Sequence, residues 1–215
     1  METINQVFNF LFGQYVEHQT SEIVLEAIAV VFGLLSVWYA KKDNILVYPT
    51  GIISTLIFVY LLFNWGLLGD MLINAYYFLM SIYGWYNWTR KVDDTHFTPI
   101  TKTNAKEQLI MSFIFFASFL FVVLVYWMYD KFNTWTAYID TLTTAIFFVG
   151  MWLMARKKIE NWIFWILGDI ISVPLYFFKG YTLTSIQYFI FLIIAYYGYI
   201  AWKKSLDKNP RTSLK

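Results

Sequence analysis

The chain has no cysteine and only two histidines among its 215 residues, which excludes several kinds of chemistry at once. Without cysteine there can be no disulfide bonds, thiolate nucleophiles or cysteine-bound metals. His18 and His96 both fall outside the long apolar segments, so histidine chemistry inside those segments is excluded as well. Charged residues are also scarce, at 14% of the chain, whereas 59% of the residues are hydrophobic and 22% are aromatic.

This composition predicts an integral membrane protein, because a soluble domain of this length could not bury so much apolar surface. Residues 3–17 are apolar but short, and they lack a basic start and a cleavage site. They predict a helix in the membrane interface rather than a signal peptide. Seven longer segments predict transmembrane helices, at residues 22–40, 44–63, 69–88, 106–128, 137–155, 161–178 and 182–202.

The basic residues predict the orientation of these spans. Of the 16 lysines and arginines, 14 fall on one side of a seven-span arrangement, and only Lys131 and Lys179 fall on the other. The positive-inside rule then predicts an N-terminus outside the cell and a cytoplasmic C-terminus. The small net charge of +2 gives no indication of nucleic-acid binding.

An internal repeat relates the two ends of the chain at an offset of 114 residues. Each predicted unit has three spans, so one connecting span between the units restores the direction and makes the repeats parallel. The predicted fold is therefore an all-α integral membrane protein with seven transmembrane helices in a 3+1+3 arrangement, a plan in which transporters hold substrate between repeats. The matched pairs include Trp38 with Trp152, Gly66 with Gly180, Gly84 with Gly198 and Trp88 with Trp202. The predicted parts are residues 1–21 (interfacial segment), 22–88 (first repeat), 89–136 (linker and fourth helix), 137–202 (second repeat) and 203–215 (basic tail).

Asp169 is an acid deep within the predicted sixth span. An ionisable side chain at membrane depth is costly and by default marks a functional site. Trp165 and Trp162 precede it by four and seven residues, so on a helix the three side chains share one face. A carboxylate beside two indoles suits a cationic, aromatic solute. The alternatives are a polar clamp between helices for Asp169 and an aromatic belt at the membrane surface for Trp162.

Other polar residues in the spans are secondary candidates for substrate binding. Asn74 and Gln187 lie at near-equivalent repeat positions, and amides can bind a sugar hydroxyl or an aminopyrimidine edge, although they also join helices to one another. Ser54, Thr55 and Ser81 are weaker candidates, because hydroxyls in membrane helices often bond to their own backbone. No metal site and no cofactor are predicted.

Four stretches of the chain resemble the PnuC family of vitamin transporters, and the resemblance extends over nearly the full length. They are residues 82–88 (IYGWYNW), 159–165 (IENWIFW), 175–181 (LYFFKGY) and 185–188 (SIQY). The resemblance implies a 3+1+3 fold and facilitated uptake of an unphosphorylated vitamin, which a cytoplasmic kinase then traps.

The resemblance also bears on the site. The family's Trp-x-x-Trp motif matches Trp162 and Trp165, and Asp169 stands where the riboside-type pattern has Asn. That pattern also has Gln at the position of Asn74, and Asn at the positions of Ser54 and Ser81. Members of the family carry nicotinamide riboside, and relatives carry thiamine or riboflavin. Nicotinamide riboside and thiamine are aromatic cations that suit an acid, whereas neutral riboflavin suits it less well.

The expected function is therefore uptake of nicotinamide riboside, with thiamine as the alternative, across a bacterial inner membrane. The predicted partners are the vitamin and the lipid bilayer, and the sequence leaves a homo-oligomer open. An intramembrane enzyme would need a nucleophile with a base, paired acids or metal ligands, which the spans lack. A seven-span photoreceptor would need a retinal-linking lysine in the last span, and residues 182–202 contain none. A membrane sensor or scaffold without transport stays open.

Overall fold

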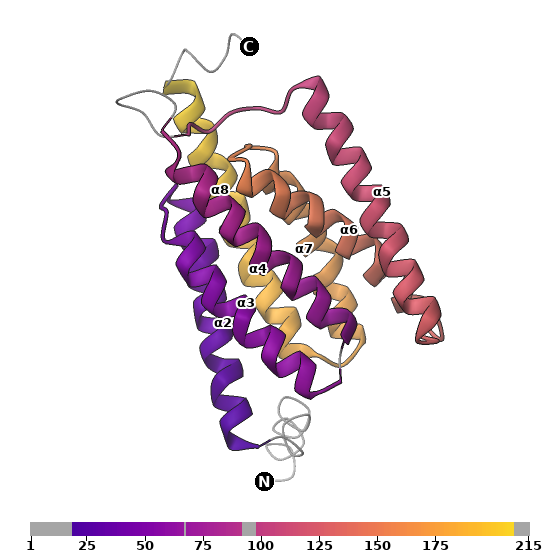
Figure 1. Cartoon of the computed structure of the whole chain (residues 1–215). Coiled ribbons are helices and arrows are strands. Elements are labelled where there is room, and N and C mark those ends of the chain that lie inside the picture. Colours follow the sequence, from indigo (N-terminus) through magenta and orange to yellow (C-terminus); the bar gives the residue numbers. More distant parts are fainter. Residues whose placement is uncertain (1–18, 67, 92–97, 209–215) are drawn as a thin grey trace.

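The computed structural model describes residues 19–66, 68–91 and 98–208. These residues form seven α-helices, one at each predicted span (Figure 1). The interfacial helix predicted for residues 3–17 lies outside the described residues. The helices are α2 (Thr20–Lys41), α3 (Val47–Asn64), α4 (Leu68–Thr89), α5 (Ala105–Met128), α6 (Trp135–Ala155), α7 (Asn161–Phe178) and α8 (Thr182–Lys208).

Among the described residues, six helical segments are long and apolar enough to cross a membrane, and α4 is the helix that falls short. The physical reason is that Asp70, Asn74 and several tyrosines lower the hydropathy of α4. Its length of 22 residues still equals that of α2. Because α4 packs against both α3 and α6, other helices cover part of its surface.

Two groups of three helices make up the bundle. In the first group α3 packs against α2 and α4, and in the second α7 packs against α6 and α8. The groups meet where α2 contacts α8 and where α4 contacts α6, while α5 packs on α6 at the edge of the bundle (Figure 1). At the repeat offset, α2 corresponds to α6 and α8 corresponds to α4. The α2–α8 contact is therefore equivalent to the α6–α4 contact, as a two-fold relation between the groups would require.

Local geometry repeats at the offset of 114 residues that the sequence indicated. Helices α3 and α7 begin and end at matched positions. The turns before them place Asp43 and Lys157 at φ of 54° and 59°, and the turns after them place Gly66 and Gly180 at 71° and 82°. These matches support the internal repeat. The parallel 3+1+3 description remains a prediction.

We call the end of the bundle that holds the α2–α3 and α6–α7 turns the basic end, and the opposite end, where α3 and α7 finish, the distal end. At the basic end the rings of Tyr48 and Trp162 pack where Gly84 and Gly198 leave space. A Cβ atom on Gly198 would lie 2.6 Å from Cη2 of Trp162, and one on Gly84 would clash with the ring of Tyr48. Matched glycines thus admit a matched ring from the neighbouring helix.

Replacing Gly84 or Gly198 by alanine should therefore lower the thermal stability of the purified protein. Overpacking a close contact costs about 1–3 kcal/mol, and the two variants should lose similar amounts. Thermal unfolding in detergent measures the effect. Gly150→Ala is the matched control, because its added Cβ would lie 3.3 Å from Cβ of Phe164, a tight contact that a shift of a few tenths of an ångström relieves. A loss for Gly150→Ala as large as for the other two would contradict this explanation.

Candidate substrate site

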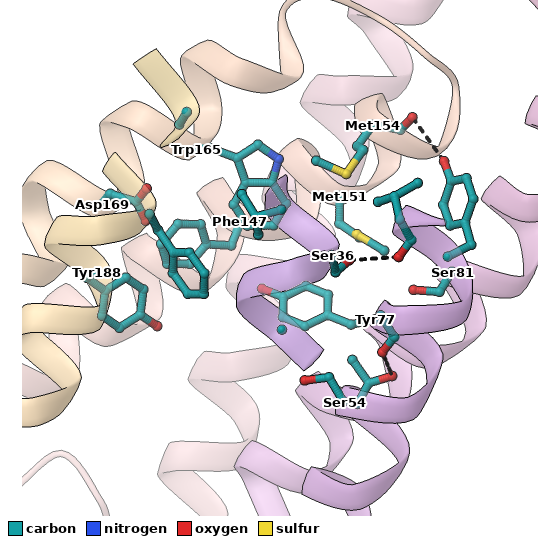
Figure 2. Close-up of a pocket in the computed structure, with 18 residues that line it drawn as sticks. Ser36, Ser54, Tyr77, Ser81, Phe147, Met151, Met154, Trp165, Asp169 and Tyr188 are labelled. Atoms are coloured by element: carbon teal, nitrogen blue, oxygen red, sulfur yellow. Dashed lines mark hydrogen bonds between the residues drawn. The ribbon is translucent and has the colours of Figure 1, made fainter. Parts of the chain in front are cut away.

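A cavity of about 200 Å³ lies between the two groups of helices (Figure 2). Its walls come from α2, α3 and α4 on one side and from α6, α7 and α8 on the other. The first group contributes Gly33, Ser36, Val37, Val47, Tyr48, Gly51, Ser54, Thr55, Tyr77 and Ser81. The second group contributes Phe147, Met151, Met154, Trp165, Asp169, Tyr188, Phe191 and Ala195. Asp169 is the only residue of this lining that carries a formal charge.

Asp169 is buried without a partner for one of its oxygens. The residue is 2% exposed, and Oδ2 accepts no hydrogen bond from any described residue. The indole Nε1 of Trp165, one helical turn earlier, is likewise buried without an acceptor. Buried polar atoms are normally paired, so unpaired ones in a cavity wall indicate groups that bind something other than the protein. The two side chains offer an unused acceptor on Asp169 and an unused donor on Trp165.

An aromatic wall surrounds this carboxylate (Figure 2). The ring of Phe147 stacks on Trp165 with centroids 5.4 Å apart, and on Tyr188 with centroids 5.9 Å apart. Tyr77 reaches across from α4, with its ring centroid 6.4 Å from that of Trp165. Ring faces attract a cation through their quadrupoles, and this attraction strengthens when water is excluded. The α6–α8 side of the cavity is therefore suited to a positively charged ring.

The opposite wall presents small residues and hydroxyls. Ser36 donates to the carbonyl of Val47 at 2.7 Å, and Ser54 donates to the carbonyl of Ala29 at 2.8 Å. Thr55 donates to a carbonyl of its own helix, also at 2.8 Å. Because these hydroxyl protons are committed to the backbone, the oxygens remain available as acceptors. This wall therefore favours a ligand that carries hydrogen-bond donors.

The structure brings five of the predicted site residues to the cavity: Asp169, Trp165, Ser54, Thr55 and Ser81. The three hydroxyls were the weaker candidates in the sequence, yet all of them line the wall. Ser54 and Thr55 do bond to backbone carbonyls, as hydroxyls in membrane helices often do. That bonding does not remove them from the cavity surface.

The other three predicted residues, Trp162, Asn74 and Gln187, lie outside the lining of this cavity. Trp162 is fully buried against Trp202, with ring centroids 5.5 Å apart. The amide of Asn74 donates to the carbonyl of Asp70 at 3.0 Å, one turn back in its own helix. Gln187 precedes the lining residue Tyr188 on α8. Binding roles for these three remain predictions that the geometry of the cavity does not support.

Sequence reasoning missed the aromatic residues Phe147, Tyr77 and Tyr188. A signal was available in the repeat. Gly33 matches Phe147 and Gly51 matches Trp165 at the offset of 114 residues, and all four line the cavity. A glycine in one repeat opposite a ring in the other indicates a position where the two repeats have diverged.

Among the described residues there is no group of three or more histidine, aspartate or glutamate side chains that could hold a metal ion. The cavity combines a carboxylate, ring faces and hydroxyl acceptors, which together suit an organic cation with hydrogen-bond donors.

Comparisons with known proteins find similarity to vitamin and nucleotide transporters. The sequence model of the nicotinamide mononucleotide transporter family matches residues 23–204. The nicotinamide riboside transporter PnuC of Escherichia coli (strain K12) is 26% identical, covering 88% of this chain and 89% of the relative. The riboflavin/roseoflavin transporter RibM of Streptomyces davaonensis is 24% identical, covering 98% and 97%.

A solved structure supports the same fold. The crystal structure of the vitamin B3 transporter PnuC superposes with a TM-score of 0.64 at 22% identity, covering 90% of this chain and 86% of that one. The resemblance to PnuC proteins is thereby confirmed, and the chain belongs to the nicotinamide mononucleotide transporter family.

Proposed function

We propose that this protein takes up an unphosphorylated vitamin that contains a positively charged aromatic ring, and that nicotinamide riboside is its first candidate substrate. The observation that carries the proposal is the buried, unpaired carboxylate of Asp169 within an aromatic wall. A cationic ring against Phe147 or Trp165 would neutralise that carboxylate and cover it. The hydroxyls of a ribose would donate to the oxygens of the opposite wall.

The charge of the cavity argues against the nucleotide named in the family description. A mononucleotide carries a phosphate, and the lining contains no lysine or arginine to receive it. Placing a phosphate beside Asp169 would bring like charges together in a desolvated space. The riboside lacks this group. Thiamine, also a cationic aromatic, is the second candidate, whereas riboflavin is neutral and leaves the charge of Asp169 uncompensated.

We infer that the 3+1+3 description applies, with the N-terminus outside and the basic end in the cytoplasm of a bacterial cell. Support comes from the matched helix bounds and from the one-sided distribution of lysine and arginine. Transport then consists of the two repeats rocking about the central cavity, which opens to each side in turn. A cytoplasmic kinase would trap the product.

Equilibrium binding to the purified protein tests the substrate. Nicotinamide riboside should bind, thiamine should bind comparably or more weakly, and nicotinamide mononucleotide should bind far more weakly. The riboside-type pattern has Asn at this position, but it also has Asn at the positions of Ser54 and Ser81, which this chain lacks. Asp169→Asn alone should therefore weaken binding of the cations by about 30-fold or more, because losing one partner of a buried charge pair costs about 2–5 kcal/mol. Asp130→Asn makes the same chemical change on the exposed α5–α6 turn and should leave binding unchanged. Equal binding of the riboside to wild type and Asp169→Asn would sink the proposal.

Transport in proteoliposomes tests the mechanism. Since Asp169 is the only acid in the lining, no second carboxylate is available there to relay a proton. We expect riboside uptake to continue when ionophores collapse the membrane potential and the pH gradient. Uphill accumulation of unmodified riboside after both gradients have been collapsed would contradict uniport. Binding without any flux would instead favour a sensor.

A further inference from the structure

A second cavity, of about 470 Å³, lies at the distal end of the bundle. It is enclosed by the start of α4, the end of α5, the start of α6 and the turn after α7, and it shares no lining residue with the central cavity. Its charged residues are Asp70, Lys131, Asp140 and Lys179, and the rings of Tyr126 and Tyr181 stand beside them. The proposed function does not use this cavity.

The ammonium group of Lys179 occupies a defined position there. It pairs with the carboxylate of Asp140 and lies over the ring of Tyr176, 5.2 Å from its centroid. The two paired side chains are mostly covered, at 21% and 14% exposed. A carboxylate combined with a tyrosine face is the environment that binds organic cations. The ammonium of Lys179 therefore occupies a position that is suited to a positive charge.

A row of aromatic rings joins this position to the central cavity. Tyr181, in the lining of the distal cavity, contacts Tyr176 with ring centroids 6.4 Å apart. Tyr176 stacks on Tyr188 at 5.0 Å, and Tyr188 stacks on Phe147 at 5.9 Å. Tyr188 and Phe147 line the central cavity beside Asp169. Contacts between aromatic side chains thus connect the walls of the two cavities.

We propose that the distal cavity is a second binding site, selective for an aromatic organic cation, in which the arriving cation displaces the ammonium of Lys179 from Asp140 and Tyr176. The inference rests on the proposed function in one respect: the transported solute is taken as the natural occupant of the distal cavity. Lys179 acts as a tethered competitor, so the site is weak and releases its occupant readily. Asp70 and Lys131 also line this cavity and make no ion pair with any described residue. They contribute to the electrostatic potential of the cavity but do not occupy the position beside Asp140 and Tyr176.

The alternative occupant is an anion held by Lys131 and Lys179. The geometry disfavours it, because Lys179 is already committed to a carboxylate and Asp70 adds a further negative charge. An anion would have to break the Asp140–Lys179 pair and leave Asp140 uncompensated in a partly covered position. The experiment distinguishes the two occupants.

The test is equilibrium titration of the purified full-length chain with 1-methylpyridinium, in an Asp169→Asn background that removes the central carboxylate. Lys179→Met should tighten binding by about tenfold, because the tethered competitor is gone while Asp140 and Tyr176 remain. Lys131→Met is the matched control: it makes the same charge change in the same cavity but leaves the Lys179 contacts intact, and it should change affinity by about twofold or less. Adding Tyr176→Leu to Lys179→Met should reverse the gain.

Equal tightening by Lys179→Met and Lys131→Met would overturn the proposal, since only net charge would then matter. Binding of inorganic phosphate that is lost in Lys179→Met would also overturn it, in favour of an anion site. The outcome is separable from that of the proposed function. A 1-methylpyridinium site in Asp169→Asn that tightens in Lys179→Met supports the second site even if no vitamin binds centrally. The absence of such a site refutes the second site even if riboside binding depends on Asp169.

Discussion

Two hydrogen bonds that cross between the helix groups fix the arrangement on which the central cavity depends. The indole of Trp88 donates to the carbonyl of Met154 at 3.0 Å, and the indole of Trp202 donates to the carbonyl of Ala40 at 2.9 Å. The bonds are related by the offset of 114 residues in both donor and acceptor. Both indoles are buried, so separating the groups at the basic end would leave two donors unpaired away from water, which is costly. The ion pair of Lys157 with Asp43, at 2.8 Å, joins the α6–α7 turn to the α2–α3 turn. These three contacts hold the two groups of helices together at the basic end.

The matched scaffold makes the few positions where the repeats differ decisive for the chemistry of the cavity. Thr55 matches Asp169, and Ser54 matches Gly168, whose lack of a side chain admits the ring of Phe147. At these positions one repeat contributes hydroxyl groups, while the other contributes the carboxylate and space for a ring. An asymmetric solute, with a charged ring at one end and hydroxyl groups at the other, fits walls that have diverged in this way. A symmetric pair of walls would hold such a solute in two equivalent orientations.

Helix positions could be predicted from hydropathy because a membrane helix must satisfy its backbone internally over a fixed thickness. Asp169 could be predicted because an acid is rare in such a segment, and the repeat could be predicted from matched glycines and tryptophans. The surroundings of single side chains could not. Helical spacing places Trp162 on the face of Asp169, but only the packed structure shows that the space above Gly198 accepts its ring. Asn74 bonds within its own helix, an outcome that spacing alone does not distinguish from one in which the amide faces a ligand.

The single carboxylate of the central cavity also bears on how a passive carrier could avoid moving empty. With the cavity unloaded, an ionised Asp169 has no compensating charge in the lining, and rocking the repeats would carry that charge through a low-dielectric environment. A bound cation would neutralise it, so the proposed loaded form would meet a smaller electrostatic barrier than the unloaded form. At the distal end the carboxylate of Asp140 is compensated within the chain, because it pairs with the ammonium of Lys179. If Asp140 is compensated at rest by Lys179 and Asp169 only by substrate, the charge of the solute becomes the condition for movement.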